Sequence, residues 1–319
     1  MAAPLIELEV PDIRAHRRSA TGTDYVHVID SGCSGPNVMV NALTHGNEIC
    51  GAIAVDRLLR EGVKPVRGKL TLAFANIDAF ERFDTRNPYS TRFVDEDLNR
   101  VWLPATLDGN RRSSELARAR ELRPFVDAAD YLLDIHSMLE PSPPVMICGT
   151  LDKGIRFAFD VGIPVHVVSD AGHANGTRMR DYGGFGDPAS PRNALLVECG
   201  QHWERAAADV AWQTTWRFLR TLEMVDAAAA ARQIDDVAPF PQCLIRVTDT
   251  VVARSAAFRF AKAFTGLEVV AKAGDAIAYD GQEVVRAPYD NCVLVMPVPN
   301  NVKAGLTAVR LGRIEPAPA

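Results

Sequence analysis

The sequence has no uninterrupted apolar run approaching the ~20 residues that a membrane-spanning helix needs, and it has no surplus of basic residues. Its 35 lysines and arginines stand against 40 aspartates and glutamates, which gives a formal net charge of -5. Nucleic acids and anionic membranes bind to basic surfaces, so neither is an expected partner. The N-terminal segment lacks the basic start and apolar stretch of a signal peptide, so we expect a cytoplasmic protein.

Cysteine is sparse and scattered, without CxxC pairs or the density of a disulfide-rich domain. We therefore expect reduced thiols, as in other cytoplasmic proteins. The cysteines are Cys33, Cys50, Cys148, Cys199, Cys243 and Cys292. The 319 residues, of which 47% are hydrophobic and 24% charged, have an ordinary globular composition and suffice for one large domain or two unequal ones.

Strand-like and helix-like segments alternate between residues 24 and 232, which predicts an α/β fold. The predicted strands cover residues 25–29, 37–43, 69–76, 131–136, 145–148, 165–168 and 193–199. The predicted helices cover residues 49–60, 113–128, with an interruption at Pro124, and 203–232. Residues 78–111 form a long, polar, arginine-rich loop, and loops of this length inside compact domains tend to be functional.

The pattern changes after residues 235–242 (DDVAPFPQ), which contain two prolines. The segments that follow are short, alternate between apolar and polar residues, and are divided by glycine, proline and aspartate turns. We therefore expect two domains. Residues 1–234 should form an α/β domain with a mixed, mostly parallel sheet flanked by helices, and residues 241–319 a small β domain.

The strongest local motif is His45-Gly46-Asn47-Glu48, at the point where a predicted strand gives way to a predicted helix. Ligands of open α/β sheets bind at the carboxyl ends of the strands. Gly46 permits the bend that turns His45 and Glu48 into one crevice, and an imidazole with a carboxylate is two-thirds of a two-His, one-Glu zinc site. The alternative is that Asn47 and Glu48 cap the helix and the histidine is incidental.

Asp134 and His136 lie at the end of another predicted strand (YLLDIHS). Because side chains alternate along a strand, both face one side, while Ile135 faces the other. His136 would supply a third metal ligand, and Asp134 could hold the second nitrogen of a ligand imidazole. A packed or hydrogen-bonded histidine is the alternative for His136 taken alone.

Glu198 closes a third apolar strand (LLVECG). A catalytic zinc keeps one position open for water and lowers the pKa of that water to ~7. A carboxylate beside the metal could take a proton from the water and return it to a leaving nitrogen. Alternatively, Glu198 could cap the helix predicted to begin near Trp203.

The arginine-rich loop contains the segment TRFVDEDLNR (residues 91–100), with Arg92, Asn99 and Arg100. A guanidinium group binds a carboxylate through two parallel hydrogen bonds, and one aimed at a carbonyl oxygen would stabilise an oxyanion. A solvated charged loop, whose signs nearly cancel, is the alternative.

Taken in order, HGNE, TRFVDEDLNR, DIHS and VECG resemble the aspartoacylase/succinylglutamate desuccinylase family of zinc-carboxypeptidase-like amidohydrolases. The resemblance spans about residues 24–232. It implies a zinc-carboxypeptidase-like fold and one zinc ion per chain, with His45, Glu48 and His136 as zinc ligands and Glu198 as general base and acid.

The same resemblance implies roles for the arginine-rich loop. Arg92 matches the family arginine that polarises the scissile carbonyl, and Asn99 and Arg100 match the pair that grips the α-carboxylate of the substrate. The small β domain resembles the family's partial lid over the active site.

The chain departs from aspartoacylase between residues 170 and 193, where its segment is longer and richer in glycine. Arg178 is the better match to the family arginine that grips a side-chain carboxylate, and Arg180 is close behind. Tyr279 and Tyr289 are both candidates for the tyrosine of the family's lid. The resemblance therefore leaves the acyl group and the amine open.

These features together predict a zinc-dependent amidohydrolase that cleaves a small N-acyl amino acid, or a related amide, to a carboxylate and an amine. A metallocarboxypeptidase acting on peptides is the alternative among enzymes. A carrier or binding protein of biotinyl or lipoyl type is the alternative outside enzymes, but the candidate hairpins DGQE and YDNC carry no lysine. The expected partner is a small-molecule substrate, and homo-oligomerisation is left open.

Overall fold

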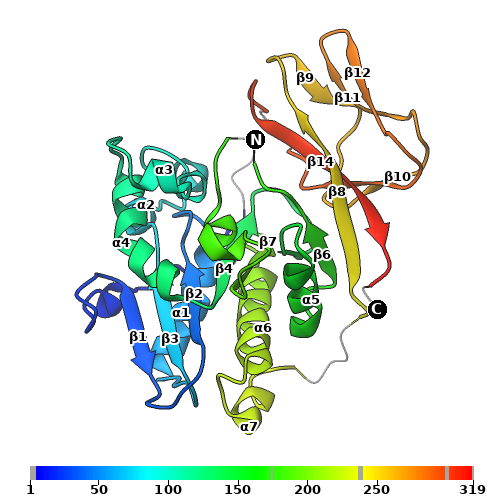
Figure 1. Ribbon diagram of the computed structural model, residues 1–319. Helices are drawn as coiled ribbons and strands as arrows, with labels where there is room; N and C mark the ends of the chain where they lie inside the picture. Colours follow the sequence, from blue (N-terminus) through cyan, green and yellow to red (C-terminus); the bar gives the residue numbers. More distant parts are fainter. Residues whose placement is uncertain (1–4, 174, 236–239, 299–301, 318–319) are drawn as a thin grey trace.

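The computed structural model describes residues 5–173, 175–235, 240–298 and 302–317. Within them, eleven strands form one sheet in the order β1-β3-β2-β4-β7-β5-β6-β8-β14-β13-β10, and three form a second sheet in the order β12-β11-β9 (Figure 1). The strands are β1 (Val26–Asp30), β2 (Asn37–Ala42), β3 (Lys69–Phe74), β4 (Tyr131–Met138), β5 (Val145–Ile147), β6 (His166–Ser169), β7 (Asn193–Gln201), β8 (Cys243–Val252), β9 (Phe258–Phe260), β10 (Val269–Val270), β11 (Ala276–Asp280), β12 (Glu283–Arg286), β13 (Cys292–Val295) and β14 (Thr307–Glu315). The α-helices are α1 (Ile49–Arg60), α2 (Ile77–Phe80), α3 (Pro104–Leu107), α4 (Ser114–Ala128), α5 (Asp152–Val161), α6 (Arg205–Thr221) and α7 (Ala227–Ala231).

The part of the large sheet from β1 to β6 is mixed and mostly parallel, as the sequence predicts. β2 runs parallel to β3 and β4, β4 runs parallel to β7, and β5 runs parallel to β6. The pairs β1–β3 and β5–β7 are antiparallel. The carboxyl ends of β2, β4 and β7 therefore meet at one edge of the sheet, where ligands of α/β folds bind.

Helices cover both faces of this part of the sheet. α1, α5 and α6 pack on one face, where Ile49, Ile155 and Trp216 join a buried core with strand residues. α4 packs on the other face, where Leu116 and Leu122 contribute to a second core. Burying apolar area in these two cores is the main favourable term for the fold.

The strand residues alternate between the two cores. Along β4, Leu133 and Ile135 enter the first core, and Leu132 enters the second. Asp134 and His136 therefore lie on the face of the second core, and both are buried. The polar residues of β4 are thus on the α4 side of the sheet, as the period-two pattern predicts.

The predicted strands up to β7 are right to within two residues at each end, but two helix predictions are wrong. α4 continues through Pro124, because Leu122 and Val126 on either side stay buried in the second core and tertiary packing outweighs one lost hydrogen bond. The predicted helix over residues 203–232 is two helices, α6 and α7. Glu223 interrupts it with a positive φ of 53°, and Asp226 caps α7 with its side chain.

Two further segments contain more helix than the sequence pattern indicates. α5 was not predicted, although its buried residues Ile155, Ala158 and Val161 recur at intervals of three and Gly162 ends it with a left-handed φ of 82°. The loop over residues 78–111 includes α3 and short 3-10 turns, among them Leu98–Arg100. Isolated turns of this length have no hydrophobic periodicity from which to predict them.

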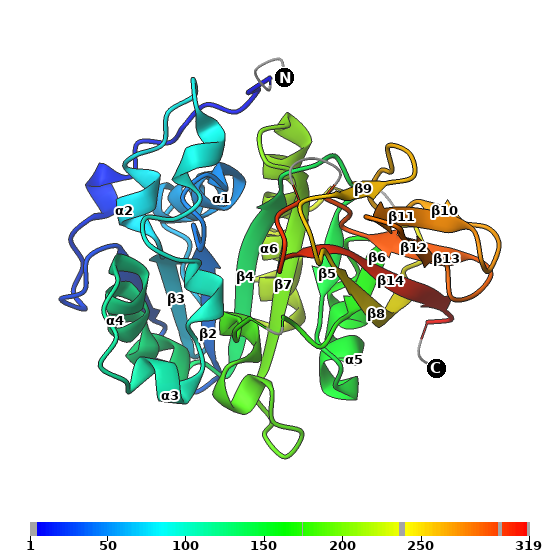
Figure 2. The ribbon, with the colours of Figure 1, turned by 90° about the horizontal axis from the view of Figure 1, so that it is seen from above.

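The C-terminal residues form strands β8 to β14, with no helix among those that the structure describes. β8 pairs in parallel with β6, so β8, β14, β13 and β10 extend the large sheet beyond its α/β part, while β9, β11 and β12 form the second sheet (Figure 2). Leu196 and Val168 share a buried cluster with Ile245 and Val293. The predicted division into two domains, and the covering of the site by the second, stay predictions.

Candidate metal centre and active site

Glu48 lies between two imidazole rings. Its Oε1 is 2.7 Å from Nδ1 of His45, and its Oε2 is 2.9 Å from Nδ1 of His136. All three side chains are buried, and each offers a ligand atom within 4.8 Å of the others. Glu48 directly precedes α1, but its side chain makes no capping hydrogen bond. The three predicted ligands therefore meet in one place, in the donor set of a two-His, one-Glu zinc site.

Gly46 allows the chain to pass through a crowded position between these ligands. Its N–H donates to the carbonyl oxygen of Arg92 at 3.0 Å. A Cβ atom at Gly46 would stand 2.4 to 2.6 Å from backbone atoms of Ala79, Phe80 and Thr91. Because backbone atoms cannot move aside cheaply, close approach of these segments is what requires glycine here.

Each imidazole also contacts a second carboxylate through its other nitrogen. Nε2 of His136 is 2.8 Å from Asp134, and Nε2 of His45 is 2.9 Å from Asp97. Such carboxylates fix the ring orientation and leave Nδ1 directed at a metal. Sequence reasoning identified Asp134 but missed Asp97, whose signal was its position two residues before Asn99 in the DLNR segment.

The buried charges of this cluster favour a cation between them. Burial would raise the pKa of Glu48, but His45 and His136 hold it well below its usual range. Burial would lower the pKa of His136, but Asp134 and Glu48 raise it well above its ordinary value. A divalent metal ion supplies the positive charge that these carboxylates attract.

Glu198 lies beside the cluster. It is opposite His136 in the register of β4 and β7, and its buried Oε2 has no hydrogen bond to any residue that the structure describes. Burial raises the pKa of Glu198 to about 8. Glu204 is the residue that precedes α6, so the helix-capping alternative does not apply to Glu198. A buried carboxylate left unpaired in this way has the features of a proton-transfer group.

Arg92 lies on the more open side of the cluster. Its Nη1 is 3.1 Å from Oε1 of Glu48, and its Nη2 is 2.9 Å from Nε2 of His45. Its side chain is 37% exposed. The carboxylate of Glu115 on α4 accepts hydrogen bonds from the N–H groups of residues 94–96, which fixes the backbone just after Arg92. The segment is therefore an ordered part of the site and not a solvated charged loop.

Asn99 and Arg100 follow in the same segment. The buried Asn99 accepts a hydrogen bond from the N–H of Met179 at 2.9 Å. Arg100 lies 3.7 Å from Asp97, and its Nη2 is 3.0 Å from Nε2 of His173. Arg100 is thus connected to the metal cluster through Asp97.

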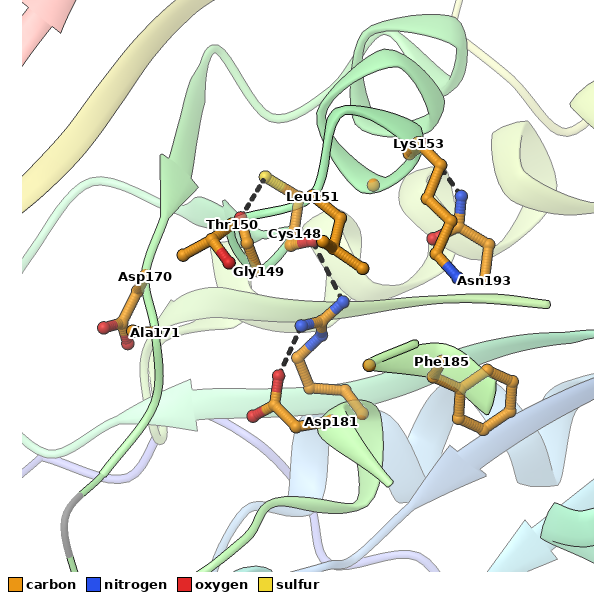
Figure 3. A pocket seen from close by; sticks show the side chains of 13 residues that line it. Cys148, Gly149, Thr150, Leu151, Lys153, Asp170, Ala171, Asp181, Phe185 and Asn193 are labelled. Atoms are coloured by element: carbon orange, nitrogen blue, oxygen red, sulfur yellow. Dashed lines mark hydrogen bonds and ion pairs between the residues drawn. The ribbon is translucent and has the colours of Figure 1, made fainter. Parts of the chain in front are cut away.

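Arg178 and Arg180 are both buried in ion pairs. Arg178 is 3.0 Å from Asp170 and 2.5 Å from Asp181. Arg180 also pairs with Asp181 and donates to the carbonyl oxygen of Cys148. Arg180 lines a cavity of about 180 Å³, with Asp170, Asp181 and Cys148 also in its wall (Figure 3). None of the three ligand-type residues lines this cavity, so it is separate from the metal cluster.

The two candidate tyrosines have partners within the C-terminal strands. The ring of Tyr279 lies 4.3 Å from the guanidinium carbon of Arg259, and the hydroxyl of Tyr289 is 2.6 Å from that of Thr248. These contacts connect neither tyrosine to the metal cluster.

A carboxylate bridging two oriented imidazoles, with an unpaired acid and an arginine beside it, has the groups needed for metal-assisted hydrolysis. The sequence matches a model of the succinylglutamate desuccinylase/aspartoacylase catalytic domain over residues 34–219. The chain belongs to this family. The family consists of deacylases that act on small acyl-amino-acid substrates, and the matched region includes the three ligand-type residues and Glu198. The predicted family is thereby confirmed.

Solved structures of the family share the fold of the chain at low sequence identity. Succinylglutamate desuccinylase from Vibrio cholerae is 17% identical, with a TM-score of 0.65 over 93% of this chain and 89% of that one. A succinylglutamate desuccinylase/aspartoacylase from Rhodobacter sphaeroides is 16% identical, with a TM-score of 0.67 over 92% of this chain and 90% of that one. The ectoine utilization protein EutE from Ruegeria pomeroyi, solved with product bound, is 17% identical, with a TM-score of 0.61 over 89% and 87%.

No curated protein matches the sequence significantly. Among the described residues, no helix has both the length and the apolar character needed to cross a membrane.

Proposed function

We propose that this family member is a zinc-dependent amidohydrolase that cleaves a small N-acyl amino acid, or a related amide, to a carboxylate and an amine. One observation carries the proposal: the carboxylate of Glu48 is held between Nδ1 atoms of His45 and His136, with the unpaired Glu198 on the neighbouring strand. Membership of a deacylase family supports the same reaction class.

His45, Glu48 and His136 would hold the zinc ion. The residues fit because neutral imidazole nitrogen and carboxylate oxygen are the usual donors of catalytic zinc. Asp97 and Asp134 would keep the two rings in place from behind. When bound, zinc would polarise the scissile carbonyl and lower the pKa of a water molecule to ~7.

Glu198 would carry the proton during the reaction. Its Oε2 is free of hydrogen bonds from other described residues, so it can accept a proton from the attacking water. Burial favours the protonated form of this carboxyl group, which helps it to retain the proton until the leaving nitrogen takes it. The same residue thus acts first as a base and then as an acid.

Arg92 would stabilise the negative charge that develops on the carbonyl oxygen. Its guanidinium group already lies within 3.1 Å of both His45 and Glu48, on the side of the cluster that is partly exposed. A fixed cation in a largely buried site stabilises an oxyanion more strongly than water does.

Asn99 and Arg100 would bind the α-carboxylate of the substrate, because a guanidinium fork matches a carboxylate in shape and charge. Arg178 would reach a second carboxylate only by giving up Asp170 or Asp181, with which it is paired.

Turnover of matched substrates tests the proposal. N-acyl amino acids, the corresponding neutral N-acyl amines and short peptides are offered to protein whose metal content has been measured. We expect hydrolysis of N-acyl amino acids, loss of that activity on chelation, and its return with zinc. Cleavage of peptides instead would indicate a metallocarboxypeptidase. Zinc-loaded, folded protein that hydrolyses no substrate of the panel would contradict the proposal.

A further inference from the structure

Arg310 connects the C-terminal strands to the candidate active site. It lies on β14, where it is paired with Thr250 of β8 and Val295 of β13. Its side chain is buried, and its Nη2 lies 2.9 Å from Nε2 of His173. The last strand of the chain thus directs a cation at the residue that also contacts Arg100.

His173 is shared by these two guanidinium groups. Nη2 of Arg100 is 3.0 Å from Nε2 of His173, and Nη2 of Arg310 lies 2.9 Å from that nitrogen and 3.0 Å from Nδ1. Burial, and after it the charges of Arg310 and Arg100, lower the pKa of His173 to about 2, so the ring is neutral. In a neutral imidazole one nitrogen carries the proton, so only the other can accept a hydrogen bond. It therefore cannot satisfy two charged donors at once.

The nearby carboxylates do not supply the hydrogen-bond acceptors that Arg100 and Arg310 lack. Asp97 is 3.7 Å from Arg100 and is already engaged by the metal cluster. Asp170 is 3.3 Å from Nε of Arg310 but is shared with Arg178 at 3.0 Å. Although that Nε is within ion-pair distance, it makes no hydrogen bond with any described residue. Buried charged donors without full partners are costly, so these two arginines would be stabilised by an anion.

We propose that Arg310 is the second cation of the carboxylate clamp: the substrate carboxylate lies between Arg100 and Arg310 and takes over the contacts that both make with His173. This inference rests on the proposed function and deepens it by assigning a specificity role to the C-terminal strands. Two guanidinium groups match the two oxygens of one carboxylate.

Arg178 is not an equivalent candidate, although it is buried in the same region. Its guanidinium group pairs with two carboxylates, Asp170 and Asp181, although each is also within ion-pair distance of another arginine. Arg310 has a share of Asp170 only. The arginine with the less complete set of partners is the one available to a ligand.

Kinetics of Arg310 variants test the clamp. Arg310→Gln should raise KM for N-acyl amino acids on the order of tenfold to a hundredfold, the scale of lost hydrogen bonds to a charged group, and should change kcat much less. Arg310→Lys keeps the charge without the fork and should give an intermediate KM. Arg313→Gln, at an exposed position of the same strand, should behave as the wild type. Neutral N-acyl amines should be insensitive to all three changes.

A binding measurement separates the clamp from catalysis. In Glu198→Gln protein, titration calorimetry with N-acetyl amino acids should show weaker binding when Arg310→Gln is added and unchanged binding when Arg313→Gln is added. Thermal unfolding of each protein verifies the fold. If Arg310→Gln does not fold, Arg310→Lys replaces it in the binding measurement.

The outcomes distinguish the two proposals. If the wild type hydrolyses no N-acyl amino acid but carboxylate binding still depends on Arg310, the proposed function fails and the clamp stands. If turnover and binding of N-acyl amino acids are the same with and without Arg310, the clamp is wrong while the proposed function stands. Equal losses for acids and neutral amines would also overturn the clamp, as would the absence of any binding to Glu198→Gln protein.

Discussion

Oδ2 of Asp134 lies 2.8 Å from Nε2 of His136, two residues further along β4. The other oxygen of this carboxylate accepts hydrogen bonds from Asn41 and Thr44, both at 2.8 Å, so the carboxylate is held in one orientation. The ring of His136 is consequently turned with Nδ1 towards Glu48. A histidine fixed in this way is oriented for a metal before the metal binds.

Metal content is the first prediction. We expect about one zinc ion per chain, as in other two-His, one-Glu sites, and a sharp decrease in both His45→Ala and His136→Ala, because each change removes a ligand atom. Elemental analysis of purified protein measures this. His166→Ala, on β6 and outside the cluster, is the matched control and should keep its zinc. Full metal content in both ligand variants would place the metal elsewhere.

Replacing Glu198 by glutamine is the second prediction. An amide is nearly isosteric with the carboxylate but cannot accept the proton, so kcat should fall by roughly a hundredfold or more while zinc and fold are kept. Steady-state kinetics and elemental analysis measure both. Glu204→Gln, at the exposed residue before α6, is the control and should leave kcat unchanged. An undiminished kcat in Glu198→Gln would assign the base elsewhere, with Asp134 the next candidate.

The strands and the ligand-type residues could be predicted because local chemistry determines them. β2, β4 and β7 are nearly continuous apolar runs, as strands covered on both faces must be, and each is followed or ended by polar residues that the core does not explain. The period of two along β4 was enough to place Asp134 and His136 on one face.

The parts that could not be predicted depend on residues that are far apart in the chain. Asp97 contacts His45 across 52 positions, and Arg310 contacts His173 across 137. No local pattern connects such residues, and each charge taken alone is typical of a solvated surface. The pairing of β8 with β6 could not be predicted from local sequence either. The change in hydrophobic pattern near residue 240 indicates a domain boundary and not a shared sheet.

Gly46 provides a prediction about the packing of the site. Gly46→Ala should lower the free energy of unfolding by roughly 1–3 kcal/mol through overpacking and should reduce zinc content, because the neighbouring backbone would displace His45 and Glu48. Denaturant unfolding and elemental analysis measure the two effects. Gly274→Ala is the control: it has a φ of +87° and open space around it, so it should cost about 1 kcal/mol by backbone strain and keep its zinc. Unchanged stability and zinc in Gly46→Ala would show that the close approach is unimportant.

Arg100→Lys tests whether the substrate carries a carboxylate next to the amide nitrogen. The change keeps the positive charge but removes the planar fork, so affinity for N-acyl amino acids should fall although net charge is the same. The loss should largely vanish for the matching substrate amides, which the wild type should already bind poorly. KM values for the two substrate series measure this. If neutral N-acyl amines are hydrolysed as fast as the acids, and Arg100→Lys is silent for both, the α-carboxylate is not recognised by this loop.

The neutral state of His173 leads to a prediction about pH and stability. Burial and the adjacent Arg310 and Arg100 lower the pKa of His173 in the folded protein to about 2, whereas an unfolded histidine has a value of about 6.5. Between these values the unfolded chain binds the proton and the folded chain does not, so stability is complete above about pH 6.5 and decreases as the pH falls. Between pH 7 and pH 5 the contribution of His173 to the free energy of unfolding should fall by about 2 kcal/mol, which is 1.36 kcal/mol for each of roughly 1.5 pH units.

The variant His173→Gln tests this prediction, because glutamine keeps a hydrogen-bond acceptor between Arg100 and Arg310 but does not titrate. Urea unfolding of both proteins at the two pH values should therefore show a smaller decrease in the variant, while all other histidines contribute equally to both. An equal decrease in the two proteins would mean that His173 is protonated in the folded state as readily as in the unfolded chain, and that the two arginines do not act on it as their distances indicate.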